Sequence, residues 1–98
     1  MLVRFADKRL ERLEIEAGYA AGFGHNVVKA FRKLMPILRS AKDQRDLYAM
    51  KSLHFEKLKG ARSHQRSLRL NQQFRLIVEL VEDHEKMLVV VMGIEDYH

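Results

Sequence analysis

The chain contains no cysteine and only one proline and five glycines among its 98 residues. The lack of cysteine excludes disulfide bonds and thiolate chemistry. No apolar run approaches the ~20 residues that a membrane span requires, and the first residues, MLVRFADKRL, lack the apolar core of a signal peptide. The scarcity of proline and glycine argues against disorder and long linkers. We therefore expect a cytoplasmic protein that makes no contact with a membrane.

The length and the apolar content predict a single domain over residues 1–98. Apolar residue types make up 47% of the chain, which suffices for one modest core, and 32% of the residues are charged. A chain of this size buries only about two-thirds of its unfolded surface, which leaves little material for a second domain.

The net charge of +5 is distributed unevenly. Residues 51–75 contain seven basic side chains and one acid, a net charge of +6, whereas residues 76–98 contain one basic side chain and six acids, a net charge of −5. A concentrated cationic segment favours a polyanionic partner such as nucleic acid. A merely basic, soluble surface is the alternative.

The first half of the chain has the periodicity of two helices. Asp7 is placed to cap the first one, and Asn26 the second. The second helix has the stronger apolar face, formed by Val27, Val28, Phe31, Leu34, Met35 and Leu38. Pro36 removes a backbone donor within this pattern, so we expect a kink or a break there.

The second half changes to the two-residue alternation that is typical of strands. We predict strands over residues 2–5, 53–58, 66–70 and 74–80, and an almost continuously apolar strand over 87–94 that is buried on both faces. Residues 40–52 are polar and stay unassigned. Helices followed by strands predict an α+β fold, with two N-terminal helices packed on one antiparallel sheet.

The alternating segment 66–76 predicts a hairpin with a short connection over residues 71–73. With that connection, the residues that face each other are Leu70 and Phe74, Arg69 and Arg75, and Leu68 and Leu76. Strand alternation then places the leucine-containing pairs on one face and the two arginines on the other.

Arg69 and Arg75 are the strongest candidates for a functional site. Like charges directly opposite each other destabilise a sheet, so a pair of guanidinium groups suggests an anion held between them. Phosphate fits best, because each guanidinium can donate two parallel hydrogen bonds to it. A one-residue change of register, or neutralisation by Glu79 or another acid, would remove this site.

His98 is the candidate for proton transfer, because histidine titrates near neutral pH. The sequence ends with Asp96, Tyr97 and His98 directly after the apolar strand, which would hold these side chains near the sheet; a frayed end is the alternative. His54 lies in the basic segment, either lining the site or on plain surface. No metal-ligand spacing and no phosphate-binding glycine loop occur, so we expect neither a metal nor a cofactor.

Three segments of this chain resemble the HigB branch of the RelE/ParE superfamily of type II toxins. They are the sequences LKG at 58–60, SLRLNQQFRL at 67–76 and EDYH at 95–98. The family patterns are roughly L-K-G, Y-S-I-R-V-N-x-Q-[WY]-R-I and x-D-Y-H, in the same order, and Arg66 stands here in place of the aromatic residue that opens the second pattern. Together, at this spacing, the three segments are fairly specific.

The resemblance implies a RelE-like microbial ribonuclease fold and a toxin that cuts mRNA in the ribosomal A site. It also implies a cognate helix-turn-helix antitoxin, HigA-like, and the 30S subunit with its rRNA as partners. The residues that match the site positions of the family, or neighbour them, are Lys59, Arg69, Arg75, Asp96, Tyr97 and His98. We expect four further residues to bind nucleic acid: Lys57, Arg62, Arg66 and His54.

The sequence is also compatible with two other functions. The ParE branch of the superfamily shares the scaffold but inhibits DNA gyrase without cutting RNA, and the basic hairpin would then dock a protein. A third possibility is an RNA-binding module without catalysis.

Overall fold

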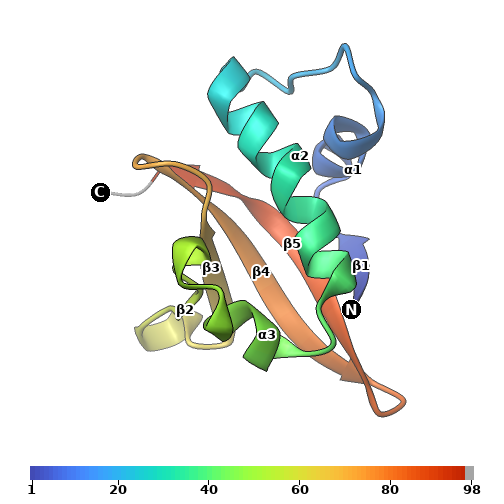
Figure 1. Cartoon of the computed structure of the whole chain (residues 1–98), viewed down its shortest axis with the longest axis vertical. Coiled ribbons are helices and arrows are strands. Elements are labelled where there is room, and N and C mark those ends of the chain that lie inside the picture. Colours follow the sequence, from blue (N-terminus) through green and yellow to red (C-terminus); the bar gives the residue numbers. More distant parts are fainter. Residues whose placement is uncertain (97–98) are drawn as a thin grey trace.

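A computed structural model of the chain describes residues 1–96 as helices packed on a five-stranded sheet (Figure 1). The strands lie in the order β1-β5-β4-β3-β2. Their bounds are β1 Leu2–Phe5, β2 Glu56–Lys57, β3 Gln65–Arg69, β4 Phe74–Asp83 and β5 Lys86–Asp96. All neighbouring strands are antiparallel except β1 and β5, which run parallel. The predicted α+β class is confirmed, with one parallel pair added to the sheet.

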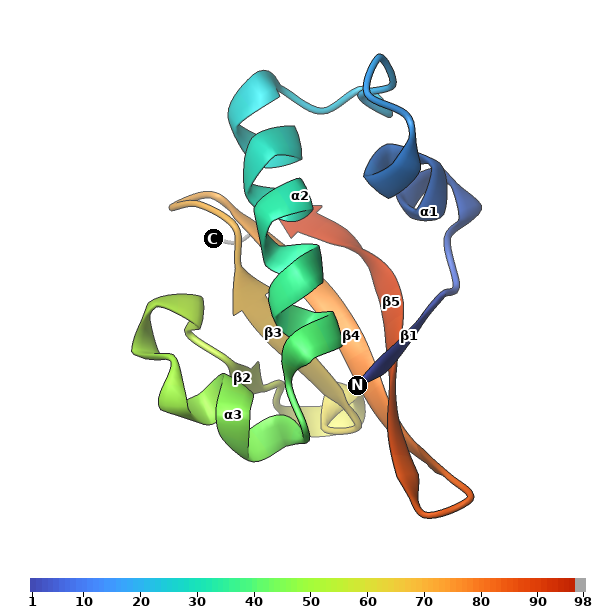
Figure 2. The same cartoon turned by 45° about the vertical axis from the view of Figure 1, so that its right-hand side comes forward.

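Three α-helices cover one face of this sheet. They are α1 Lys8–Ile15, α2 His25–Ser40 and α3 Gln44–Ala49. Figure 2 shows α2 crossing in front of the strands, with α3 near the edge formed by β2 and β3. Two 3₁₀ turns, η1 Lys51–Leu53 and η2 Gly60–Arg62, flank β2 on either side in the sequence. No helix within residues 1–96 is long and apolar enough to cross a membrane.

The helix caps agree only partly with expectation. The side chain of Asp7 accepts a hydrogen bond from the backbone nitrogen of Arg9 at 2.9 Å, and so caps α1 as predicted. Helix α2 is instead preceded by Gly24 as its cap and already includes Asn26. The backbone amino group of Met1 donates to the carbonyls of Leu38 and Arg39, near the end of α2, which joins β1 to that helix.

The predicted break at Pro36 is absent, because α2 continues to Ser40 as one helix. An interior proline costs about 3 kcal/mol. Fully burying one large apolar side chain contributes about 1.5–3 kcal/mol. All six apolar residues of the predicted face of α2 are buried, so tertiary packing outweighs the local penalty. Five of these side chains, all except Val27, belong to the core cluster together with Leu10 and Leu13 of α1 and Leu68, Leu76, Val78, Val89 and Val91 of the sheet.

Two predicted strands differ from the structure. The segment 53–58 contains only two strand residues, because Leu53 lies in η1 and His54 turns the chain. Strand β5 lies between two other strands as expected, but it is not buried on both faces along its length, since Val90 and Met92 are partly exposed. The unassigned residues 40–52 contain α3, which Asp43 caps and which buries Leu47.

Candidate functional site

The β3–β4 hairpin has the register that the alternation predicts. Leu68 lies opposite Leu76, and Arg69 lies opposite Arg75. The connection is closed by the side-chain oxygen of Asn71, which accepts from the backbone nitrogens of Gln73 at 2.8 Å and Phe74 at 2.7 Å. A short polar side chain that bonds to the backbone two residues ahead is typical of tight turns. The turn therefore supports the pairing of the two arginines, which we call the arginine pair.

Both members of the arginine pair contact His54. The guanidinium of Arg75 donates to the backbone carbonyl of His54, and Arg75 is only 7% exposed. Nη1 of Arg69 lies 3.2 Å from Nε2 of His54. Because a guanidinium has donors only, Nε2 is assigned as the acceptor, which places the ring proton on Nδ1. The arrangement brings two permanent cations and one proton acceptor together.

The backbone of His54 is held in the left-handed region, with φ 46° and ψ 50°. For a residue with a side chain, this conformation costs of the order of 1–3 kcal/mol and persists only where surrounding structure enforces it. Here Leu53 and Phe55 are both buried in the core, and Arg75 binds the intervening carbonyl. Sequence patterns missed this turn because its partners come from distant parts of the chain.

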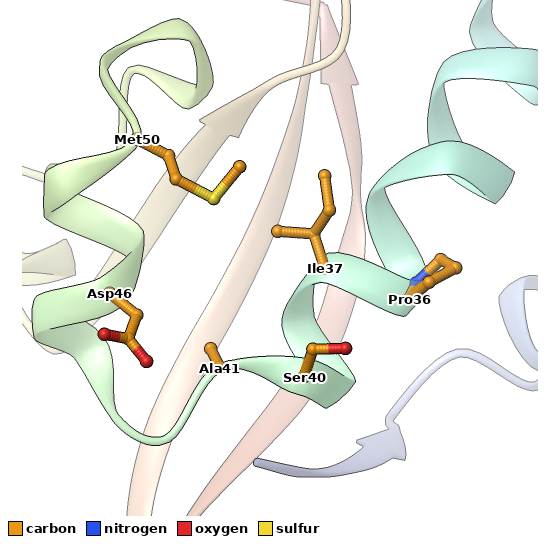
Figure 3. Close-up of a pocket in the computed structure, with 6 residues that line it drawn as sticks. All are labelled: Pro36, Ile37, Ser40, Ala41, Asp46 and Met50. Atoms are coloured by element: carbon orange, nitrogen blue, oxygen red, sulfur yellow. The ribbon is translucent and has the colours of Figure 1, made fainter.

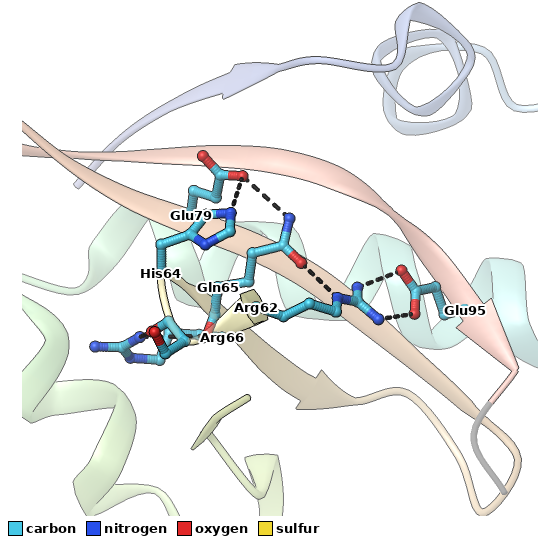
Figure 4. Close-up of polar contacts among 7 residues, drawn as sticks. Arg62, His64, Gln65, Arg66, Glu79 and Glu95 are labelled. Atoms are coloured by element: carbon cyan, nitrogen blue, oxygen red, sulfur yellow. Dashed lines mark hydrogen bonds and ion pairs between the residues drawn. The ribbon is translucent and has the colours of Figure 1, made fainter. Parts of the chain in front are cut away.

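An acidic residue on the neighbouring strand lies beside the arginine pair: Glu95 of β5 is opposite Arg75 of β4. Both oxygens of Glu95 accept from Arg62, at 2.9 and 2.6 Å (Figure 4). The hydrogen bond to Glu95 raises the pKa of the Arg62 guanidinium above its ordinary value. Glu79, which could have neutralised the arginine pair, instead accepts from Gln65 at 3.1 Å. A register shift between Ile77 and Val78 brings Glu95 opposite Arg75, whereas a regular register from the turn would place Ile94 there, so the sequence alone could not reveal Glu95.

The remaining basic candidates lie along the β2–β3 edge. Lys57 is exposed and lies opposite Arg66, whose Nη1 donates to the carbonyl of Ser63 at 3.1 Å. Lys59 is exposed and directly precedes η2. Within residues 1–96, no hydrogen bond or ion pair joins Lys59 to the arginine pair.

The end of β5 contacts the hairpin connection. Asp96 lies opposite Phe74, and the side-chain amide of Gln73 donates to its carboxylate at 3.0 Å. The predictions for Tyr97 and His98 lie outside the described residues. In the part of the chain that the structure covers, no three His, Asp or Glu side chains gather as metal ligands do.

Two hollows on the surface differ in their lining: one is mainly apolar, and the other includes basic side chains. A hollow of about 370 Å³ lies between the end of α2 and α3 (Figure 3). Its lining residues are Pro36, Ile37, Ser40, Ala41, Asp46 and Met50. The carboxylate of Asp46 accepts from the backbone nitrogen of Lys42 at 2.8 Å, and Asp46 is the only ionisable residue in this lining. A second hollow, of about 220 Å³, is lined by Lys33 of α2 and Arg69 among others, which adds a cation beside the arginine pair.

The fold is similar to that of a known class of small toxins. A solved structure, the YoeB/ParE toxin from Agrobacterium tumefaciens, matches over 100% of both chains with a TM-score of 0.59. The sequence identity is 14%, so this likeness shows the fold alone.

The sequence assigns the family within that class. Residues 3–98 match the family described as RelE-like toxin of type II toxin-antitoxin system HigB. The chain therefore belongs to the HigB-like toxin family, and the predicted membership is confirmed. A toxin of this type has an antitoxin as its partner. No curated protein matches the chain.

Proposed function

We propose that this toxin is a metal-independent endoribonuclease that cuts mRNA in the A site of the 30S subunit and thereby inhibits translation. The observation that carries the proposal is the convergence of the arginine pair on His54. Two fixed cations beside a proton acceptor suit the cleavage of an RNA phosphodiester. A toxin that acts on ribosomes is located in the cytoplasm, and its partners are mRNA, rRNA and a helix-turn-helix antitoxin.

The reaction uses a nucleophile that RNA itself provides. A base takes the proton of the 2′-hydroxyl, and the oxygen attacks the adjacent phosphorus. The bond from phosphorus to the 5′-oxygen breaks, and that oxygen accepts a proton, which leaves a 2′,3′-cyclic phosphate and a 5′-hydroxyl. Negative charge grows on the phosphoryl oxygens during the attack. Arg69 and Arg75 stabilise this charge, and one well-placed donor contributes roughly 3–4 kcal/mol.

Two proton transfers require two groups. His54 is one, since its imidazole lies beside the arginine pair, with Nε2 at 3.2 Å from Nη1 of Arg69, and it takes a proton when the substrate phosphate draws Arg69 away. His98 is the other, with Asp96 and Tyr97 as its neighbours in the sequence. A positioned acid or base contributes about 10²–10⁴ in rate. Lys59 polarises the 2′-hydroxyl or assists the arginine pair.

The surrounding residues bind RNA without reading its sequence. Lys57 and Arg66 lie opposite each other at the open edge of the sheet and suit two successive phosphates. Tyr97 stacks on a base, which contributes about 1–3 kcal/mol in comparable complexes.

Primer extension on a defined mRNA tests this function. The purified toxin is added to a reconstituted translation system, and 5′ ends are mapped after a short incubation. Breaks that appear only on translating ribosomes and follow the reading frame support the proposal.

A parallel assay of DNA supercoiling by gyrase separates the alternative function. Inhibition of gyrase without any mRNA breaks would identify a ParE-like inhibitor instead. Salt-sensitive RNA binding with no cleavage product would identify a binding module.

A further inference from the structure

An acidic side chain lies next to the arginine pair in the sheet. Arg69 is opposite Arg75 across β3 and β4, and Arg75 is opposite Glu95 across β4 and β5. Side chains directly opposite each other on neighbouring strands have Cβ atoms about 4.5–5.5 Å apart. Glu95 is therefore within reach of the guanidinium that the proposed function assigns to phosphate, and it is a potential competitor for it.

The carboxylate of Glu95 is occupied by another arginine. Nη1 and Nη2 of Arg62 donate to its two oxygens at 2.9 and 2.6 Å, in a bidentate pair. The third donor of Arg62, Nε, binds the side-chain oxygen of Gln65 at 2.9 Å. Gln65 in turn donates to Glu79 (Figure 4). All three nitrogens of the Arg62 guanidinium are therefore hydrogen-bonded, two to Glu95 and one to Gln65.

The Arg62–Glu95 ion pair adds little to the stability of the fold. The side chains of Arg62 and Glu95 are 46% and 47% exposed, and an ion pair in such a position contributes about 0–1 kcal/mol. Orientation is what the bidentate geometry provides, because two parallel hydrogen bonds fix a carboxylate in direction as well as in distance. Figure 4 shows the pair on the face of the sheet that is turned away from the helices.

We propose that Arg62 is a positioning residue: by occupying both oxygens of Glu95, it preserves the positive charge of the arginine pair for a phosphate group. Without Arg62, the carboxylate of Glu95 turns to Arg75, the cation opposite it in the register. Arg62 thus acts through Glu95 and does not touch the RNA. This inference rests on the proposed function, and it replaces the direct contact with nucleic acid that the sequence suggested for Arg62.

A double-mutant cycle tests the inference with four proteins: the unchanged toxin, Arg62→Gln, Glu95→Gln and the double variant. Cleavage of ribosome-bound mRNA is measured as kcat and KM. Arg62→Gln is expected to lower kcat about tenfold, a typical size for coupled neighbours. Adding Glu95→Gln removes the competing charge and restores kcat to within about twofold of the unchanged toxin, as such coupling requires. A double variant as slow as Arg62→Gln overturns the inference.

Arg39 provides a matched control. Its Nε and Nη2 bind the carboxylate of Glu14 at 3.1 and 2.6 Å, which joins α2 to α1 through another bidentate pair with a half-exposed arginine. Arg39→Gln is expected to leave kcat unchanged. An equal loss in Arg39→Gln would show that any such ion pair matters, which also overturns a specific role for Arg62.

A second measurement separates the inference from the proposed function. Inorganic phosphate is titrated into the same four proteins without ribosomes, and the side-chain Nε–H signals of Arg69 and Arg75 are followed by NMR. Arg62→Gln is expected to weaken phosphate binding several-fold, and the double variant to restore it. If the unchanged toxin does not cut mRNA but the affinities follow this pattern, only the proposed function fails. Equal affinities in all four proteins refute the inference, whatever the toxin cuts.

Discussion

Replacing Arg75 by methionine separates the chemistry of the arginine pair from its contribution to the fold. Arg75 is 7% exposed, so truncation to alanine would leave a void, whereas methionine keeps most of the buried volume. The variant loses the donor to the His54 carbonyl. A hydrogen bond that involves a charged group contributes about 1.5–3 kcal/mol, which sets the expected fall in the free energy of unfolding.

The expected loss of activity is larger than the loss of stability. One well-placed donor to a developing oxyanion contributes about 3–4 kcal/mol, and 1.36 kcal/mol corresponds to a factor of ten in rate. Arg75→Met should therefore slow mRNA cleavage by about 10²–10³. Arg75→Lys should recover part of the rate, because it restores the charge without the forked geometry. Primer extension on translating ribosomes measures the rate, and urea unfolding measures the stability.

Arg32 offers the matched control for a purely structural arginine. It donates to the backbone carbonyls of Leu13, Glu16 and Tyr19 at 2.9, 2.7 and 3.0 Å, at the end of α1 and just beyond. Arg32→Met should lose stability at least as much as Arg75→Met and still cut mRNA at the normal rate. A folded Arg75→Met protein with undiminished cleavage would refute the assignment of this side chain.

Three further predictions concern backbone strain, proton transfer and pH. His54→Asn keeps a residue that tolerates the left-handed region and removes the imidazole, so cleavage should fall about 10²–10⁴ with little change in unfolding; normal cleavage would exclude His54 from the reaction. Glu85→Gly should raise the free energy of unfolding by about 0.5–1 kcal/mol, since His84 and Glu85 both have positive φ in the two-residue turn between β4 and β5; urea unfolding that shows no gain would contradict this. Hydrogen bonds from Arg45 lower the pKa of Asp43 from 3.8 to about 2, so this carboxylate stabilises the fold above pH 3.8 and loses the effect as the pH falls towards 2. The stability difference between the unchanged protein and Asp43→Ala should shrink over that range, and a difference that is constant with pH would show that the ion pair is irrelevant.

The hairpin could be predicted because its determinants are local. The alternation of leucine with arginine and the short polar connection at Asn71 both act within a dozen residues. Shifting the register by one residue would move the buried leucines to the opposite face, so the pattern strongly favours one pairing.

The errors occurred where distant contacts override local preference. Pro36 predicts a kink or a break, but the buried face of α2 keeps the helix unbroken. The segment 53–58 alternates like a strand, yet burial of Leu53 and Phe55 and the bond from Arg75 produce a turn at His54. Helix α3 gives almost no sequence signal, because it is short and buries only Leu47.

The sequence by itself determined the class of the fold, the family and the pairing of Arg69 with Arg75, since each depends on residues that are close in the chain or on a motif. Only the tertiary structure decided that His54 meets both arginines and that Arg62 holds Glu95. Those contacts join segments 15 to 33 residues apart. They depend on the order of the strands in the sheet, β1-β5-β4-β3-β2, which no local pattern contains.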